Sequence, residues 1–201
     1  MPNPISNTFR TMRSCRKTAT KKATIPSIFL TRRTARQLIG LNPYVVHGDP
    51  KIGLRDDSEQ MAFVKKALDD AKHLPCVLAF AHSFRFSSGV HGHGDNKDSK
   101  NAEKVAEPAL RPLFHELYQR KVSLFVAGHD HHFEQLGPVD ADGTPRDDGV
   151  RSFIVGTGGA GLYSIDYSKA WPFREAYDLY QHGVLKIELC RRNDSGREAE
   201  G

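Results

Sequence analysis

Three histidines within four positions form the densest group of chemically capable side chains in the sequence: His129, His131 and His132. They follow Gly128 and a short apolar run, 122–127, which predicts a buried strand. Side chains alternate along a strand or an extended turn, so His129 and His131 should point to one side and His132 to the other. Neutral imidazoles bind zinc, iron and manganese. The pattern therefore predicts a metal site at the end of a strand, and the alternative is a solvated polar turn.

A second apolar run, Pro75–Ala81, also ends in a histidine, His82. Ligands collect at the carboxyl ends of strands in sheets with crossover helices, so His82, His129 and His131 could converge on one ion. A single histidine at a strand end is more often a hydrogen-bonded core residue. The repetition of the pattern is what favours a metal ligand.

A loop rich in glycine and serine, 83–93, follows His82. Its backbone N–H groups and Arg85 could reach a phosphate group, and His91 would then face the substrate. His91 and His93 are also candidate metal ligands, although a flexible rim is the interpretation we favour. The alternative for the whole loop is a mobile polar segment.

Helices and strands alternate around these histidines. Apolar spacing predicts amphipathic helices over 58–72 and 108–121, each preceding one of the two apolar strands. Two further strands are expected over 150–157 and 183–189. The glycine turn 158–161 is a weak signal for phosphate binding and equally fits close packing of the backbone. The order of elements predicts the α/β class.

The charge is distributed unevenly. The 201 residues carry a net charge of +5, but no acidic residue precedes Asp49. We expect residues 1–40 to be a basic, disordered leader and 191–201 to be a charged tail. A transit peptide, a nucleic-acid-binding tail and a misplaced start are the alternatives for the leader. It lacks aromatic residues interleaved with the charge, which argues against a specific nucleic-acid site.

Several other classes of protein find no support in the sequence. The three cysteines are widely spaced and form neither a disulfide framework nor a zinc-finger pattern. No stretch is long and apolar enough to predict a membrane span. The leader lacks the apolar core of a secretory signal, so the sequence as written is cytoplasmic in character and leaves the location open.

Three segments in this order resemble the carboxyl-terminal half of the calcineurin-like metallophosphoesterases, with the purple-acid-phosphatase-like subgroup as the nearest match: 82–89, 128–134 and 155–160. The resemblance covers about residues 41–190. It implies a β-sandwich flanked by helices, with two metal ions at one edge, drawn from iron, zinc and manganese. It also implies that His82 and His129 hold the second metal and His131 the first. Relatives of this kind are often exported.

The sequence departs from the family in its first half. The family's early Asp-x-His, Gly-Asp-x-x-Asp and Gly-Asn-His motifs have no counterpart in residues 1–81; Gly48 and Asp49 are followed by Pro-Lys-Ile. Phe84 stands where a proline is usual, and Gln135 where an arginine is usual. The resemblance thus implies a partial domain, in which three imidazoles could hold one ion but could not balance or bridge two.

Two functions follow as hypotheses. The first is a truncated metal-dependent phosphoesterase that hydrolyses phosphomonoesters or diesters with metal-activated water. Its metal ligands would be His82, His129 and His131, with Arg85 and His91 at the substrate. The alternative is a non-catalytic remnant or interaction module that binds at most one ion. A partial sandwich would leave a sheet edge open to an oligomer or a partner chain.

Overall fold

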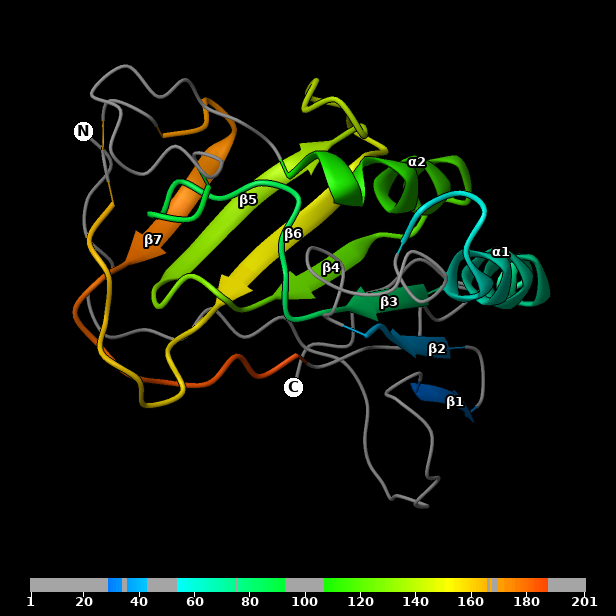
Figure 1. Cartoon of the computed structure of the whole chain (residues 1–201), viewed down its shortest axis with the longest axis horizontal. Coiled ribbons are helices and arrows are strands. Elements are labelled where there is room, and N and C mark those ends of the chain that lie inside the picture. The colour runs from blue at the N-terminus through cyan, green and yellow to red at the C-terminus, as the bar shows by residue number, and fades with distance from the viewer. Residues whose placement is uncertain are drawn as a thin grey trace, which may run out of the picture.

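The computed structural model describes residues 29–33, 36–42, 54–74, 76–92, 107–165, 167 and 170–187. Within these residues the strands form one seven-stranded sheet in the order β1-β2-β3-β4-β6-β5-β7 (Figure 1). The strands are β1 Phe29–Arg33, β2 Arg36–Gly40, β3 Cys76–Phe80, β4 Leu124–Ala127, β5 Phe133–Val139, β6 Val150–Val155 and β7 Arg174–Asp178.

The centre of the sheet is parallel and its edges are antiparallel. Strands β2, β3, β4 and β6 run in the same direction, whereas β1, β5 and β7 each pair antiparallel with a neighbour. A parallel pair needs a crossover connection. A helix lies in the connection from β2 to β3 and in that from β3 to β4, whereas β5 lies in the connection from β4 to β6. The carboxyl ends of the four parallel strands consequently meet at one edge of the sheet.

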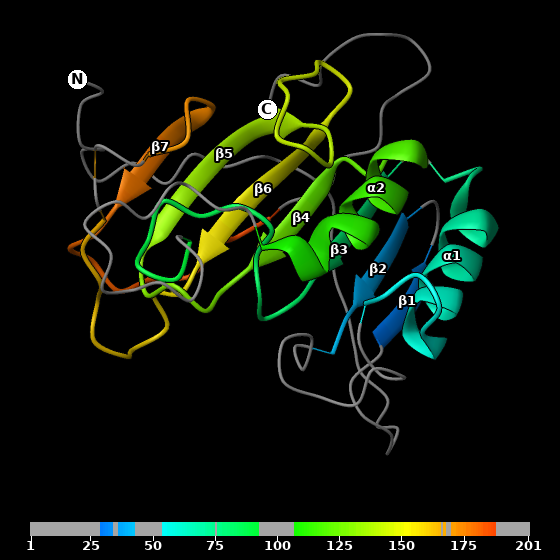
Figure 2. The same cartoon turned by 45° about the horizontal axis from the view of Figure 1, so that its top comes forward.

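Two helices cover one face of the sheet (Figures 1 and 2). Helix α1, Glu59–Ala71, begins after Ser58, whose side chain accepts a hydrogen bond from the Met61 N–H. A short 3-10 turn, Pro108–Leu110, leads into α2, Arg111–Gln119. Both predicted helices are therefore confirmed. Among the described residues, no helix has the length and apolar character that crossing a bilayer requires.

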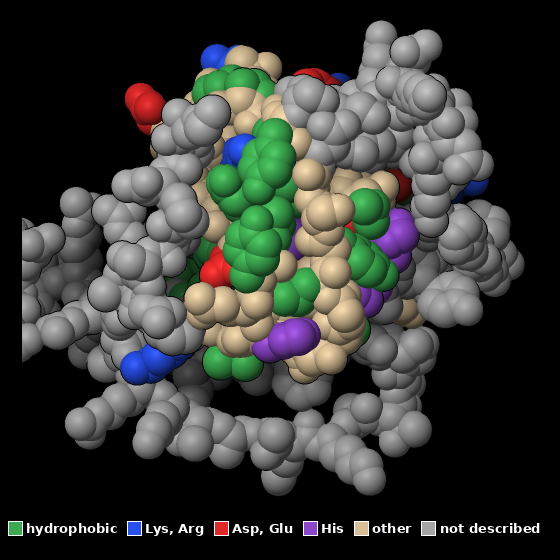
Figure 3. Space-filling view, turned by 90° about the vertical axis from the view of Figure 1, so that its left-hand side faces the viewer, with side chains coloured by type: hydrophobic (Ala, Val, Ile, Leu, Met, Phe, Trp, Pro, Cys, Tyr) green, Lys and Arg blue, Asp and Glu red, His purple; other side chains and the backbone are tan. Residues whose placement is uncertain are grey.

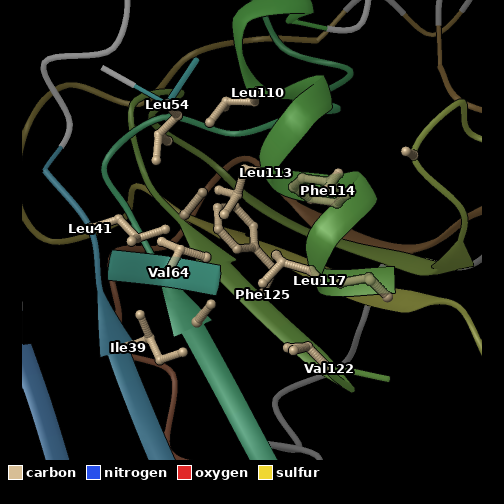
Figure 4. Packing of buried hydrophobic residues seen from close by; sticks show 14 of the residues in the cluster. Ile39, Leu41, Leu54, Val64, Leu110, Leu113, Phe114, Leu117, Val122 and Phe125 are labelled. Carbon is tan, nitrogen blue, oxygen red and sulfur yellow. The ribbon is translucent and has the colours of Figure 1, made fainter. Parts of the chain in front are cut away.

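The main core lies between these helices and the sheet. Figure 4 shows Val64 of α1 and Leu113 and Leu117 of α2 gathered around Phe125 of β4, and all four side chains are fully buried. Burying one such side chain contributes about 1.5–3 kcal/mol. This packing fixes β3 and β4 under the helices, and with them the ends from which the histidines project.

A smaller apolar cluster occupies the opposite face of the sheet. Leu78, Leu124 and Phe153 form it, and Leu185 and Ile187 pack against it. The predicted strand 183–189 is wrong over its described part, because 183–186 form no strand and only Ile187 makes an isolated bridge. Leu185 and Ile187 are partly buried and pack against the sheet through their side chains, whereas Val184 is exposed.

The mixed α/β class predicted from the sequence is confirmed. The described strands form one sheet instead of the two of a complete sandwich. Residues 29–33 and 36–40, which were expected within the leader, form β1 and β2 and belong to the sheet. The remainder of the predicted leader, 1–28, and the predicted tail, 191–201, lie outside the described residues.

Candidate metal centre

The first part of the candidate site lies where β3 and β4 end side by side. Backbone pairing continues beyond the strands: Ala81 N–H donates to Val126 O at 3.1 Å, and Gly128 N–H donates to His82 O at 2.9 Å. The backbone at His82 is therefore bonded directly to the residue before His129. Main-chain hydrogen bonds thus hold together two segments that are far apart in the sequence.

The two histidines at these strand ends point at each other. His82 Nε2 and His129 Nδ1 are 3.0 Å apart, and the rings meet edge to face with centroids 5.0 Å apart. In the absence of an ion, one nitrogen donates to the other. Two nitrogens that share one ion at metal–nitrogen distances of about 2.1 Å would be separated by roughly 3.0–3.4 Å. The spacing thus suits either a hydrogen bond or a shared ion.

The segment that carries His129 is a pair of tight turns, not the extended chain that the sequence suggested. Asp130 N–H donates to Gly128 O and His132 N–H donates to Asp130 O, each at 2.9 Å. His129 adopts a left-handed backbone conformation with φ of 67°. This conformation is uncommon for a residue with a side chain and recurs at functional sites. The predicted sidedness nevertheless holds, because His132 is fully buried whereas His129 and His131 are partly exposed.

His131 is held by the glycine turn that follows β6. Its Nδ1 lies 2.8 Å from Gly161 O, and its ring stacks on Tyr163 with centroids 4.1 Å apart and planes at 16°. The Tyr163 N–H also donates to His131 O at 2.9 Å. A proton on Nδ1 leaves the Nε2 lone pair of His131 available, which is the arrangement usual for histidines that bind metals.

His91 joins the two groups of rings. Its ring centroid lies 4.3 Å from that of His129 and 5.7 Å from that of Tyr163. A continuous series of ring contacts therefore runs from His82 through His129, His91 and Tyr163 to His131. Histidine side chains also reach the surface on the face shown in Figure 3, beside a ridge of hydrophobic groups. Tyr163 was not expected from the sequence, since nothing in its neighbourhood marks it.

Arg85 lies inside the loop that follows His82. Its Nε and Nη2 donate to Ala141 O at 3.2 and 3.0 Å, and its Nη1 donates to Glu107 O at 2.8 Å. Burial lowers the pKa of its guanidinium to about 10, so it is still charged at neutral pH. In this position Arg85 ties the loop to two other segments. To contact a phosphate it would have to leave these carbonyl groups.

Two fully buried carboxylates, Asp130 and Glu134, lie in the same segment of the chain as His129 and His131. Asp130 Oδ2 accepts a hydrogen bond from Ser87 Oγ at 2.5 Å, and Glu134 Oε2 accepts one from the Ser88 N–H at 2.9 Å. His132 Nε2 lies 3.4 Å from Glu134 Oε2. Sequence reasoning missed this pair, because the burial of Asp130 depends on the tight turns after β4 and that of Glu134 on its contact with the loop at Ser88.

The donor set fits a metal ion only in part. His82 and His129 present two nitrogens at a suitable spacing, and the hydrogen bond of His131 leaves it able to bind through Nε2. Among the described residues, however, no three histidine, cysteine or acidic side chains are grouped closely enough to hold an ion. The structure therefore brings together His82 and His129, two of the three ligands predicted from the sequence. The third, His131, is stacked on Tyr163 instead.

Comparison with known proteins gives matches to solved structures alone. No family model matches the chain, and no curated protein matches it. Purple acid phosphatase PPD1 from yellow lupin (Lupinus luteus) seeds matches with a TM-score of 0.59 and 19% identity. The match covers 77% of this chain and 27% of that one.

A second match is the protein described as GAP50, the anchor in the inner membrane complex of Plasmodium. It has a TM-score of 0.54 and 15% identity, and the match covers 75% of this chain and 42% of that one. This chain thus spans less than half the length of either protein. At such identities the likeness is one of fold: the chain folds like part of a purple acid phosphatase.

Proposed function

We propose that this chain contributes one side of a metal-dependent phosphoesterase site that hydrolyses phosphomonoesters or diesters. The observation that supports this most directly is the 3.0 Å separation of His82 Nε2 and His129 Nδ1 at the ends of two parallel strands. The phosphatase-like fold supports the same reaction class. His82 and His129 would hold one ion of zinc, iron or manganese, and His131 would contribute its Nε2.

A divalent or trivalent ion in such a site lowers the pKa of water and polarises a phosphoryl oxygen. The residues of the chain have supporting tasks. His82 and His129 supply neutral nitrogens from a rigid sheet edge, and Gly161 O keeps the proton of His131 on Nδ1. The remaining ligands would come from outside the described residues or from a partner chain.

We further propose that His91 faces the substrate. Its ring covers one side of His129, and its own backbone is anchored by an N–H that donates to Asp130 Oδ1 at 3.1 Å. An imidazole beside the metal ligands could donate a proton to a phosphoryl oxygen or to the leaving group. Arg85 is the second candidate at the substrate, provided that its guanidinium exchanges a carbonyl partner for a phosphate oxygen.

The alternative is a non-catalytic module that binds at most one ion. Two observations favour it: only two candidate ligands meet within the described residues, and one similar structure is described as an anchor. In that case the histidine pair would be a hydrogen-bonded remnant, and the sheet would serve for assembly.

Hydrolysis of chromogenic phosphate monoesters and diesters separates the two proposals. Purified protein is assayed with added manganese, iron or zinc, beside His129→Ala purified in parallel as a control for host phosphatases. The phosphoesterase proposal expects turnover that falls by at least about 100-fold in the variant, as for loss of a catalytic interaction. Equal turnover in both proteins would contradict it and favour the non-catalytic module.

A further inference from the structure

The two buried carboxylates form one network with the loop that carries His91. Asp130 and Glu134 are fully buried, and so are their partners Ser87 and Ser88, at 1% exposure or less. Burial of a charge is costly unless the charge is hydrogen-bonded. Two buried carboxylates so close to the candidate ligands therefore need a structural role, and their hydrogen bonds indicate what it is.

Asp130 reaches the loop at two points. Ser87 Oγ donates to its Oδ2 at 2.5 Å, and the His91 N–H donates to its Oδ1 at 3.1 Å. Ser87 Oγ in turn accepts the Gly89 N–H at 3.0 Å. A single side chain from the turn between β4 and β5 thus fixes both ends of the segment 87–91. His91 is held by the residue next to His129 in the sequence.

Glu134 holds the start of the same segment. Its Oε2 accepts the Ser88 N–H at 2.9 Å and faces His132 Nε2. Trp171 completes the enclosure, because its N–H donates to Ser88 Oγ at 3.2 Å and its Nε1 donates to Ser87 O at 3.0 Å. The two serines are therefore tied down by acceptors and donors from three separate segments.

The loop also requires glycine where it meets this network. A Cβ on Gly89 would lie 2.4 Å from Asp130 Oδ2, and a Cβ on Gly92 would lie 2.1 Å from Ser87 O. No real Cβ tolerates such contacts. The loop backbone consequently packs so closely against Asp130 and against itself that it leaves no room for a side chain at Gly89 or Gly92.

His82 and His129 do not depend on this network in the same way. The backbone bond from Gly128 N–H to His82 O joins their strand ends directly. His91 lies in no strand, since it stands eleven residues beyond the end of β3 in the loop that follows. Asp130 anchors the His91 N–H, and the two carboxylates together hold the serines at the start of its segment.

We propose that Asp130 and Glu134 are positioning residues that hold the loop 87–92 so that His91 stands over His129 before any ligand arrives. This inference deepens the proposed function, since it assigns the means by which a substrate-facing imidazole is placed. The geometry itself is a property of the free protein and can be measured without metal or substrate.

The test is nuclear Overhauser contact between histidine rings in metal-free, histidine-labelled protein. The wild type is expected to show contacts of His129 with both His91 and His82. Asp130→Ala should abolish the His91–His129 contact and leave the His82–His129 contact, which the strands maintain. Asp130→Asn should restore the lost contact, because its amide can still accept from the His91 N–H and donate to Ser87 Oγ.

Ser87→Ala provides a second variant if Asp130→Ala fails to fold, with the same expected loss. Ser152→Ala is the matched control, since Ser152 is also a buried serine but its hydroxyl has no hydrogen-bond partner among the described residues. Retention of the His91–His129 contact in folded Asp130→Ala or Ser87→Ala would overturn the inference. Equal weakening of both contacts would also overturn it, because it would mean general loosening.

The outcome is separable from that of the proposed function. Absence of hydrolysis in the wild type would contradict the phosphoesterase proposal. The ring contacts would still test whether Asp130 positions His91, because they are measured without substrate. Where the wild type is active, Ser87→Ala should raise KM about 10-fold with a smaller effect on kcat, as for loss of a supporting interaction. An unchanged KM with a lost ring contact would show that His91 does not bind substrate.

Discussion

Tyr163 lies flat against His131, with ring centroids 4.1 Å apart and planes inclined by 16°. The contact joins the glycine turn after β6 to the turn after β4, and the hydrogen bond from His131 Nδ1 to Gly161 O acts in the same direction. Aromatic pairs of this kind are worth about 0.5–1.5 kcal/mol. His131 is thus oriented by a stacked ring as well as by its hydrogen bond.

Replacement of Tyr163 should release the His131 ring. In Tyr163→Ala the ring-current shift of the His131 side-chain protons is expected to disappear, because the stacked ring is gone. Tyr163→Phe keeps the stacking face and should retain the shift. Histidine side-chain NMR measures both variants, and an unchanged His131 spectrum in the alanine variant would contradict the stacking.

Gly156 is expected to be intolerant of any side chain. A Cβ there would lie 1.9 Å from Asp130 O, because the turn after β4 crosses directly over the end of β6. Gly156→Ala should therefore lower the free energy of unfolding by about 2 kcal/mol or more, since neither backbone can easily yield.

Gly158→Ala is the control for that substitution. A Cβ at Gly158 meets no atom within 4 Å. Its effect should stay within about 0.5 kcal/mol, as for most surface substitutions. Urea denaturation compares the two variants, and equal stabilities would show that the turn does not pass over β6 as described.

Arg85 should matter for stability before it matters for catalysis. Arg85→Met removes the donors for Ala141 O and Glu107 O, and loss of such a buried, charged donor should cost about 2–3 kcal/mol. Arg55→Met is the control, because Arg55 and Asp57 form an exposed ion pair worth less than about 1 kcal/mol. Full stability of Arg85→Met together with a raised KM would instead assign Arg85 to the phosphate.

Acid should destabilise the turn at residues 140–144, which includes Ala141, whose carbonyl accepts from Arg85. Partial burial raises the pKa of Asp140, but hydrogen bonds from the Thr144 and Asp142 N–H groups and the Arg146 guanidinium outweigh it, and the pKa is lowered. A carboxyl with a lowered folded-state pKa stabilises the fold above its unfolded-state pKa of about 3.9. That contribution is lost as the pH falls through the folded-state value.

Amide exchange at Thr144 measures this loss. Protection should be constant above about pH 5 and should fall below about pH 4, once the carboxyl takes up a proton. Asp140→Asn is the control, because an amide keeps an acceptor but does not titrate in this range. The same acid-induced loss in Asp140→Asn would remove Asp140 as its cause.

The sequence predicted the elements whose residues repeat regularly and missed those that tertiary contacts define. The apolar faces of 58–72 and 108–121 have helical spacing, so both helices and their buried sides were foreseeable. By contrast, Arg174–Asp178 contains no apolar run and becomes a strand only because β5 pairs with it. The basic segments 29–33 and 36–40 likewise join the sheet because β2 pairs with β3 and β1 pairs with β2.

The same division applies to the candidate site. The convergence of His82 and His129 was foreseeable from two strands that each end in a histidine. The contact of His91 with His129 was not, since it depends on Asp130 folding a glycine-rich loop back over the turn. Tyr163 was also missed, because its role arises from a hydrogen bond and a stacked ring that no spacing rule encodes.

A calorimetric titration with cobalt or zinc tests most directly the central claim that His82 and His129 share a metal ion. The account predicts that the wild type binds an ion and that His82→Ala and His129→Ala each weaken binding by at least about 10-fold, because two nitrogens 3.0 Å apart share the ion. His73→Ala, at an exposed histidine beyond α1, should bind like the wild type. Binding that is unchanged in His129→Ala, or absent from the wild type, would contradict the account.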